Sequence, residues 1–168
     1  YTMRELEQSR SATAFSLRGP DGELGTLRVG VPGIHNARNA AVATIAALRA
    51  GAPFTAARDA LARFAGVSRR FEFRGEANGV TFVDDYAHLP GEVRVALATA
   101  KNGGWGRIIT VFQPHRFSRT AALADQFGTA FALADELVVT DIYGAGERPV
   151  PGVSGRLIVD AVRAHDPR

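Results

Sequence analysis

The chain of 168 residues is long enough to bury a core, because 46% of its residues are apolar, and its length allows one domain or two small ones. No apolar run approaches the ~20 residues that cross a bilayer, and the N-terminus lacks the apolar stretch of a signal peptide, so we expect a cytoplasmic protein. The absence of cysteine excludes disulfides and thiolate chemistry, and four scattered histidines make a poor zinc site, so no metal ligand is assigned.

The net charge of +3 raises the question of nucleic-acid binding. The basic residues are nearly all arginine, with Lys101 the only lysine, and they are spread along the chain. Binding to a phosphate backbone needs many clustered contacts. We therefore expect no nucleic-acid partner and no membrane partner, and the oligomeric state stays open.

The first 66 residues have the pattern of a hairpin followed by two helices. Alternating apolar residues predict strands over 12–18 and 23–29, joined by a turn at Gly19–Gly22. Helical spacing then predicts one helix from about 35 to Gly51 and another over 54–65. The second helix is expected to end at Gly66 and to bury Phe54, Ala57, Leu61 and Phe64.

After Gly66 the pattern changes to alternating strands and helices. A strand with Phe71 and Phe73 on alternate positions, a tight turn at Asn78–Gly79 and a strand over 80–84 predict a second hairpin. The elements expected next are helix 91–101, strand 107–112, helix 120–134, strand 136–140 and a helix from about 154. The last two strands are apolar runs, typical of a parallel sheet with helices on both faces.

This order predicts the α/β class, with a domain boundary near 66–70. The first domain covers residues 1–66 and contributes a hairpin and helices. The second covers residues 67–168 and has a Rossmann-like, mostly parallel sheet that is incomplete, because so few strands usually need partners.

Two polar segments follow predicted strands directly: DDYAHLP at 84–90 and QPHRFSR at 113–119. In an open α/β sheet, ligands bind beyond the carboxyl ends of the strands. The segments combine a carboxylate, two imidazoles and two guanidinium groups, which suit nucleotide hydroxyls, phosphate and carboxylate. The residues concerned are Asp85, His88, His115, Arg116 and Arg119.

Four segments resemble, in order and spacing, the Mur ligase family of peptidoglycan synthesis: GIHNARNAAVA at 33–43, GVSRRFE at 66–72, DDYAHLP, and FQPHRFSRT at 112–120. The resemblance extends over about 25–160 and includes the segment 141–147. It implies that residues 1–66 end a central ATP-binding domain and that 67–168 begin a Rossmann-like C-terminal ligase domain. The P-loop of the family is absent from the sequence, so the isolated chain is expected to be inactive.

The resemblance implies an ATP-dependent, amide-forming ligase. The member most similar to this chain joins L-alanine to UDP-N-acetylmuramate through an acyl phosphate, with ATP and Mg²⁺ as cofactors, and the magnesium ligands are expected outside the chain. One alternative is a sister ligase that joins a preformed peptide to the same sugar nucleotide, although the residues after Phe112 argue against it. The other alternative is a non-catalytic nucleotide-binding α/β module.

The resemblance assigns ATP contacts to Asn36, Asn39, Arg70 and Asp85. The two asparagines share a helix start, where their amides can instead cap the helix and where His35 can orient it. Arg70 is expected to reach the γ-phosphoryl group and so to be catalytic, its alternative being a solvated surface residue. Asp85 is expected to hold the ribose hydroxyls.

The neighbouring Arg69 and Asp84 are expected to be a surface residue and a structural residue. The family places Tyr86, His88, His115, Arg116 and Arg119 around L-alanine and the acyl phosphate, with His88 and His115 also catalytic. A helix start after His115 would add partial positive charge there. The alternatives are a plain hydrogen-bonding histidine at 88 and an exposed basic loop at 113–119.

One departure concerns residues 88–92. The family commonly reads H-H-P-T-E at this point, whereas this chain reads H-L-P-G-E. A second imidazole and a hydroxyl are therefore missing, and no role is carried over to Leu89 or Gly91. Pro90 suits the first turn of a helix, because its φ is fixed.

Overall fold

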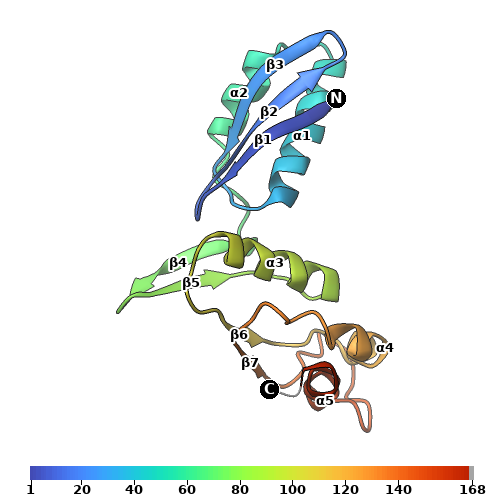
Figure 1. Ribbon diagram of the computed structural model, residues 1–168. Coiled ribbons are helices and arrows are strands. Elements are labelled where there is room, and N and C mark those ends of the chain that lie inside the picture. Colours follow the sequence, from blue (N-terminus) through green and yellow to red (C-terminus); the bar gives the residue numbers. More distant parts are fainter. Residues whose placement is uncertain (167–168) are drawn as a thin grey trace. The chain divides into compact units, whose positions relative to one another are not determined.

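The computed structural model describes residues 1–166, which form five helices and three small sheets within that range (Figure 1). The predicted mixture of α and β structure is confirmed. Two compact units are distinguished: Tyr1–Tyr86 with Asn102–Gly104, and Ala87–Lys101 with the residues from Trp105 onward. The domain boundary near 66–70 stays a prediction.

The first unit contains a three-stranded antiparallel sheet of order β1-β2-β3. The predicted hairpin is confirmed as β2 (Thr13–Gly19) and β3 (Gly22–Val29), with Phe15 opposite Leu27. The edge strand β1 (Thr2–Gln8) was not predicted, because charged side chains interrupt its alternation and it is mostly exposed. Strand β1 forms because it pairs with β2, and the residues of β1 alone do not predict this pairing.

Two helices follow this sheet, α1 (Ile34–Arg49) and α2 (Phe54–Ala62). The core of this part consists mainly of Phe15, Leu17, Leu27, Val29, Val31, Ala37, Ala40 and Ala41. Helix α2 is shorter than predicted, and its predicted apolar positions Phe54, Ala57 and Leu61 are half-buried, with Phe54 and Leu61 packed against the core. The prediction is wrong for Phe64, which lies outside the helix and is 41% exposed. Gly66 has a φ of 100° and an added Cβ would lie 2.8 Å from Val31 Cγ1, so close approach of the backbone requires glycine here.

The second hairpin is confirmed as β4 (Glu72–Ala77) and β5 (Val80–Asp84). Asn78 and Gly79 both have positive φ, as a two-residue type I′ turn requires. The expected alternation of Phe71 and Phe73 in one strand is wrong. Phe71 precedes β4 and is buried, whereas Phe73 is 41% exposed beside an irregularity in the pairing.

The second unit contains α3 (Pro90–Asn102), β6 (Ile109–Phe112), α4 (Phe117–Phe127), β7 (Glu136–Val139) and α5 (Arg156–His165). Strands β6 and β7 pair in parallel, as predicted. Helix α4 begins three residues earlier than expected and ends at Phe127, because residues 128–133 form turns instead of continuing it. The core consists of Val93, Leu97, Ile108, Phe112, Phe127, Ala130, Phe131 and Ile158.

Helices cover only one face of this parallel pair within residues 1–166. Ile108 and Phe112 lie in the core, whereas Ile109, Val111 and Val138 are 54%, 69% and 51% exposed. The expectation that both faces are covered is therefore wrong for the described part of the chain. In the same range, no helix combines the length and apolar character that membrane crossing requires.

Candidate functional site

Two loops of the second unit, 113–119 after β6 and 140–147 after β7, leave the same edge of the parallel strand pair. Their pairing continues past the strands: Thr140 N–H donates to the Phe112 carbonyl at 3.0 Å, and Tyr143 N–H donates to the Pro114 carbonyl at 2.9 Å. Arg116 N–H then donates to the Tyr143 carbonyl at 2.8 Å. The 113–119 loop and the 140–147 loop are therefore held side by side by backbone hydrogen bonds.

His115 is the centre of a side-chain cluster in this unit. Its ring centroid lies 5.8 Å from that of His88 and 5.5 Å from that of Tyr143. Arg119 Nη1 lies 3.2 Å from His115 Nδ1 and donates to the His115 carbonyl at 3.3 Å. The structure thus brings together three predicted residues, His88, His115 and Arg119. Tyr143 was missed, although its segment, 141–147, was part of the family resemblance.

The cluster favours one protonation state of His115. Burial, followed by the positive charges of Arg119, His88 and Arg116, lowers the pKa of the imidazole from its ordinary value. A guanidinium group has no acceptor, so Nδ1 must accept from Arg119 and the ring proton lies on Nε2. A neutral His115 at pH 7 therefore presents an Nε2–H donor.

His88 lies just before α3 and is anchored there by Glu92. The Glu92 carboxylate accepts the N–H groups of His88 and Leu89 at 2.9 and 3.1 Å, and lies 3.5 Å from His88 Nδ1. This arrangement satisfies donors at the start of the helix. Leu89 is 38% exposed, and nothing lies within 4 Å of a Cβ added at Gly91, so packing does not dictate either departure from the family pattern.

Arg116 lies at the start of α4 with a φ of 75° and an exposed side chain. Beside it, Ser118 donates its N–H and its hydroxyl to the Glu147 carboxylate at 2.9 and 2.6 Å. These bonds, the hydroxyl first, and the nearby charge of Arg116 lower the pKa of Glu147. The start of α4 was expected to offer its free N–H groups, with their partial positive charge, to a substrate. This is wrong for the Ser118 N–H, which donates to Glu147 instead.

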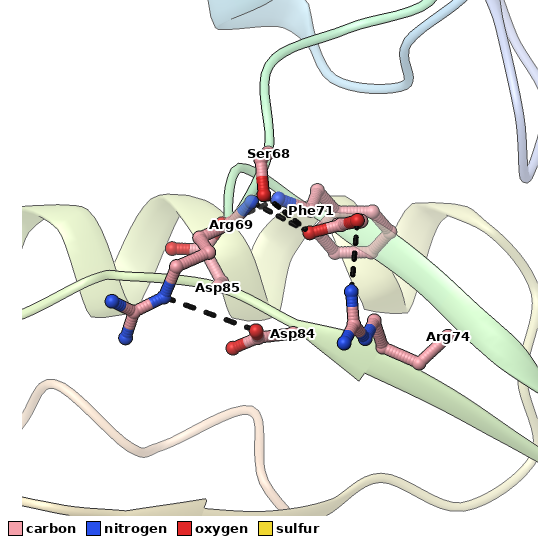
Figure 2. A network of polar contacts seen from close by, with 7 residues as sticks. Ser68, Arg69, Phe71, Arg74, Asp84 and Asp85 are labelled. Atoms are coloured by element: carbon pink, nitrogen blue, oxygen red, sulfur yellow. Dashed lines mark hydrogen bonds and ion pairs between the residues drawn. The ribbon is translucent and has the colours of Figure 1, made fainter.

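In the first unit, Glu72 organises the segment before β4. Its carboxylate accepts Arg69 N–H at 2.8 Å and the Ser68 hydroxyl at 3.1 Å, and pairs with Arg74 at 3.0 Å (Figure 2). These contacts, led by the Arg69 N–H, lower the pKa of Glu72. A single carboxylate thus holds the segment that carries the two predicted arginines.

The end of β5 is tied to the same segment. Asp85 Oδ2 accepts Phe71 N–H at 2.8 Å, and Tyr86 N–H donates to the Arg69 carbonyl at 2.8 Å. The Arg69 guanidinium lies 4.5 Å above the Tyr86 ring, and its Nε lies 3.9 Å from Asp84, toward which it points in Figure 2. Arg69, expected to be a plain surface residue, therefore has specific contacts.

Arg70 lies between two residues of positive φ, Arg69 at 60° and Phe71 at 46°. Its side chain is exposed. Positive φ is uncommon outside glycine, so the contacts of the neighbouring residues maintain a backbone that sequence propensity does not favour. This backbone sets where the predicted phosphate-binding arginine lies.

Asn36 does not cap α1. The residue at the N-cap position is Gly33, no side chain bonds to the cap, and the Asn36 amide donates to the Pro32 carbonyl at 2.6 Å. The capping interpretation of Asn36 is therefore wrong, because its amide reaches back to the preceding chain. Asn39 is exposed on α1. Burial lowers the pKa of His35 and the charge of Asp85 partly offsets this.

Residues 1–166 contain no group of three histidine, cysteine, aspartate or glutamate side chains that could hold a metal ion. Asp85, Arg70 and Asn39, three of the residues predicted to contact ATP, lie on the same unit.

Residues 69–168 match the family described as Mur ligase, glutamate ligase domain. This match covers more than half of the chain. The chain belongs to the Mur ligase family. It is 51% identical over 161 residues to the UDP-N-acetylmuramate–L-alanine ligase of Kineococcus radiotolerans, covering 95% of this chain and 34% of that protein.

Solved structures of Mur ligases are also similar to this chain. The UDP-N-acetylmuramate–alanine ligase of Thermotoga maritima has a TM-score of 0.79 at 31% identity, over 97% of this chain and 35% of that one. A murein peptide ligase of Psychrobacter arcticus has a TM-score of 0.61 at 25% identity, over 98% of this chain and 34% of that one. The α/β fold of a Mur ligase is confirmed, and the chain spans about a third of the length of these relatives.

Proposed function

We propose that this Mur ligase chain is part of an enzyme that joins L-alanine to UDP-N-acetylmuramate at the expense of ATP. The observation that carries the proposal is the cluster of His88, His115 and Arg119, with Arg116 beside it, at the carboxyl edge of a parallel strand pair. The similarity to proteins named as L-alanine ligases supports it. Cationic and neutral donors together suit an amino-acid carboxylate and a phosphorylated intermediate.

The reaction has two steps in this proposal. The carboxylate of the muramate sugar attacks the γ-phosphorus of ATP, which forms an acyl phosphate and releases ADP. The L-alanine amine then attacks the acyl carbon, and the tetrahedral intermediate expels inorganic phosphate to give the amide, the amine having lost a proton. ATP and magnesium supply the phosphoryl chemistry when bound.

On the nucleotide side, Asp85 accepts hydrogen bonds from the ribose hydroxyls and Arg70 stabilises charge on the transferred phosphoryl group. Asn36 and Asn39 contact the adenine. The bond from Phe71 N–H fixes the direction of the Asp85 carboxylate. The positive-φ backbone around Arg70 fixes the origin of its side chain. These assignments give the hydroxyl donors to a carboxylate and the phosphoryl group to a guanidinium, which are the pairings that form strong charge-assisted hydrogen bonds.

On the amino-acid side, Arg116 and Arg119 bind the L-alanine carboxylate, and His88 borders the substrate. With Nδ1 occupied by Arg119, His115 acts through Nε2–H as a hydrogen-bond donor to a developing oxyanion, not as the base for the amine. A neutral imidazole avoids adding a third full positive charge beside the two arginines.

The main alternative is a sister ligase that adds a preformed peptide. Among the solved structures, the identity of 31% and TM-score of 0.79 to an alanine ligase, against 25% and 0.61 to a murein peptide ligase, favour L-alanine. The test is formation of amide product by the full-length protein with ATP and UDP-N-acetylmuramate, supplemented with L-alanine or with a peptide. We expect amide product with L-alanine alone. Product with the peptide but not with L-alanine would establish the alternative.

A further inference from the structure

The 140–147 loop is fastened to α4 by a carboxylate that the sequence did not single out for a role. Glu147 uses both of its oxygens, Oε2 for Ser118 N–H and Oε1 for the Ser118 hydroxyl. Its own N–H donates to the Gly144 carbonyl at 3.0 Å, which closes a turn within the loop. Glu147 therefore joins a turn of one loop to the first turn of the helix that carries Arg119.

The backbone of Arg116 is held from both sides by the same elements. Its N–H donates to the Tyr143 carbonyl of the 140–147 loop, and its carbonyl accepts the N–H and hydroxyl of Thr120 in α4 at 3.1 and 2.9 Å. A φ of 75° is uncommon for arginine and persists only where surrounding contacts enforce it. The direction of the Arg116 side chain thus depends on the loop staying in place.

The loop also packs directly on the start of α4. A Cβ added at Gly144 would lie 2.9 Å from the Glu147 carbonyl and 3.2 Å from the Phe117 ring, so the backbone of the loop approaches the helix closely. Two contacts, one polar and one steric, therefore fix the same junction.

We propose that Glu147 is a positioning residue for amino-acid recognition: its bonds to Ser118 hold the 140–147 loop on α4, and the loop and helix together aim Arg116 and Arg119 at the L-alanine carboxylate. This inference rests on the function proposed above. The negative charge of Glu147, close enough to Arg116 to interact with it, contributes to the same orientation. Glu147 itself does not touch the substrate.

The test uses a graded set of variants in the full-length ligase. Glu147→Gln weakens the charge-assisted pair of bonds, Ser118→Ala removes the hydroxyl bond and keeps the N–H bond, and Ser118→Thr keeps both. We expect the KM for L-alanine to rise about tenfold for Glu147→Gln, about threefold for Ser118→Ala, and less than twofold for Ser118→Thr, because slight misplacement of binding groups is costly. Asp160→Asn, at an exposed position of α5, is the matched control and should leave this KM unchanged.

The KM for ATP and kcat separate positioning from general damage. For Glu147→Gln we expect kcat within about twofold of the wild type and an unchanged KM for ATP, since the substrate carboxylate is bound in the ground state and the transition state alike. Amide hydrogen exchange of Ser118 should accelerate about tenfold in the same variant, because the N–H loses its ionised acceptor.

The outcomes distinguish the two proposals. A wild-type protein that does not ligate L-alanine overturns the proposed function, and Ser118 exchange still reports whether Glu147 holds the loop. A wild-type protein that ligates L-alanine, with an unchanged KM for L-alanine in Glu147→Gln, overturns the positioning role. A parallel fall of kcat and thermal stability at constant KM for L-alanine also overturns it, because that pattern indicates only a structural role.

Discussion

The contact between Asp85 and Phe71 makes a quantitative prediction that separates a structural role of Asp85 from nucleotide binding. Asp85→Ala removes the acceptor of the Phe71 N–H, which lies in a partly buried position. A hydrogen bond to a charged group contributes about 1.5–3 kcal/mol. Part of this is recovered, because the φ of 46° at Phe71, which costs a non-glycine residue roughly 1–2 kcal/mol, can relax once the bond is gone.

The net loss for Asp85→Ala is therefore about 1–2 kcal/mol. For a chain of this size, 1 kcal/mol shifts Tm by about 2–4 °C, so we expect Tm to fall by roughly 2–8 °C. Asp85→Asn retains a carbonyl oxygen that can accept the same N–H, and should show less than half of this shift. Asp84→Ala is the matched control, since its exposed ion pair with Arg69 at 3.9 Å contributes little.

Thermal unfolding followed by circular dichroism measures these shifts on the chain. Steady-state kinetics of the full-length ligase provide the second measurement, in which Asp85→Asn should raise the KM for ATP more than the KM for L-alanine. A wild-type Tm in Asp85→Ala would refute the energetic argument. Equal effects of Asp85→Asn on both KM values would place Asp85 away from the ribose.

Three further predictions concern the basic loop, acid stability and the isolated chain. Arg116→Ala and Arg119→Ala in the full-length ligase should each lower kcat/KM for L-alanine roughly 30- to 1000-fold with little change in the KM for ATP, and lysine should recover only part. Near-normal kinetics in both would move the amino-acid site elsewhere. The pKa of Glu147 is lowered in the folded chain, so its stabilisation is present above the ordinary pKa of glutamate and is lost as pH falls through the lowered pKa. Glu147→Gln should therefore flatten the fall of Tm below about pH 5, and an unaltered slope would contradict this. The isolated chain, which lacks a P-loop sequence, should show no ligase turnover; phosphate release dependent on both substrates would refute this.

Most of the fold was predictable because local patterns agree with the final structure. Turn residues at Asn78–Gly79 and Gly19–Gly22 mark both hairpins, and helical spacing marks α1 and α3. The edge strand β1 was not predictable, because charged residues form a strand there only through pairing with β2. The exposed face of β6 and β7 was not predicted, because both faces of these strands carry apolar residues and the sequence does not show which face the helices cover.

The candidate site was predictable in residue type and less so in contacts. Polar residues after strand ends pointed to His88, His115 and Arg119, which the structure brings together. Glu92 bonds the backbone of His88, and Glu147 bonds Ser118 beside Arg119. Both glutamates lie in segments of the family resemblance, but their residue type alone does not show which groups they bind. Which groups these glutamates contact is decided by the tertiary structure and not by the neighbouring sequence.

The backbone of Arg116 offers a last test of whether its side chain is present for function. At a φ of 75° and a ψ of 135° glycine is the residue that fits without strain, and an arginine there costs on the order of 1–3 kcal/mol. Arg116→Gly relieves this strain but increases the freedom of the unfolded chain by about 0.4–1 kcal/mol, so Tm should stay level or rise slightly. Arg116→Ala keeps the strain and should be the less stable of the two. Because both variants lack the guanidinium group, both should lose the same 30- to 1000-fold in kcat/KM for L-alanine in the full-length ligase. A stable glycine variant with normal kinetics would show that Arg116 is dispensable; equal losses of activity with unequal Tm values would show that the chain tolerates a strained backbone in order to keep the side chain.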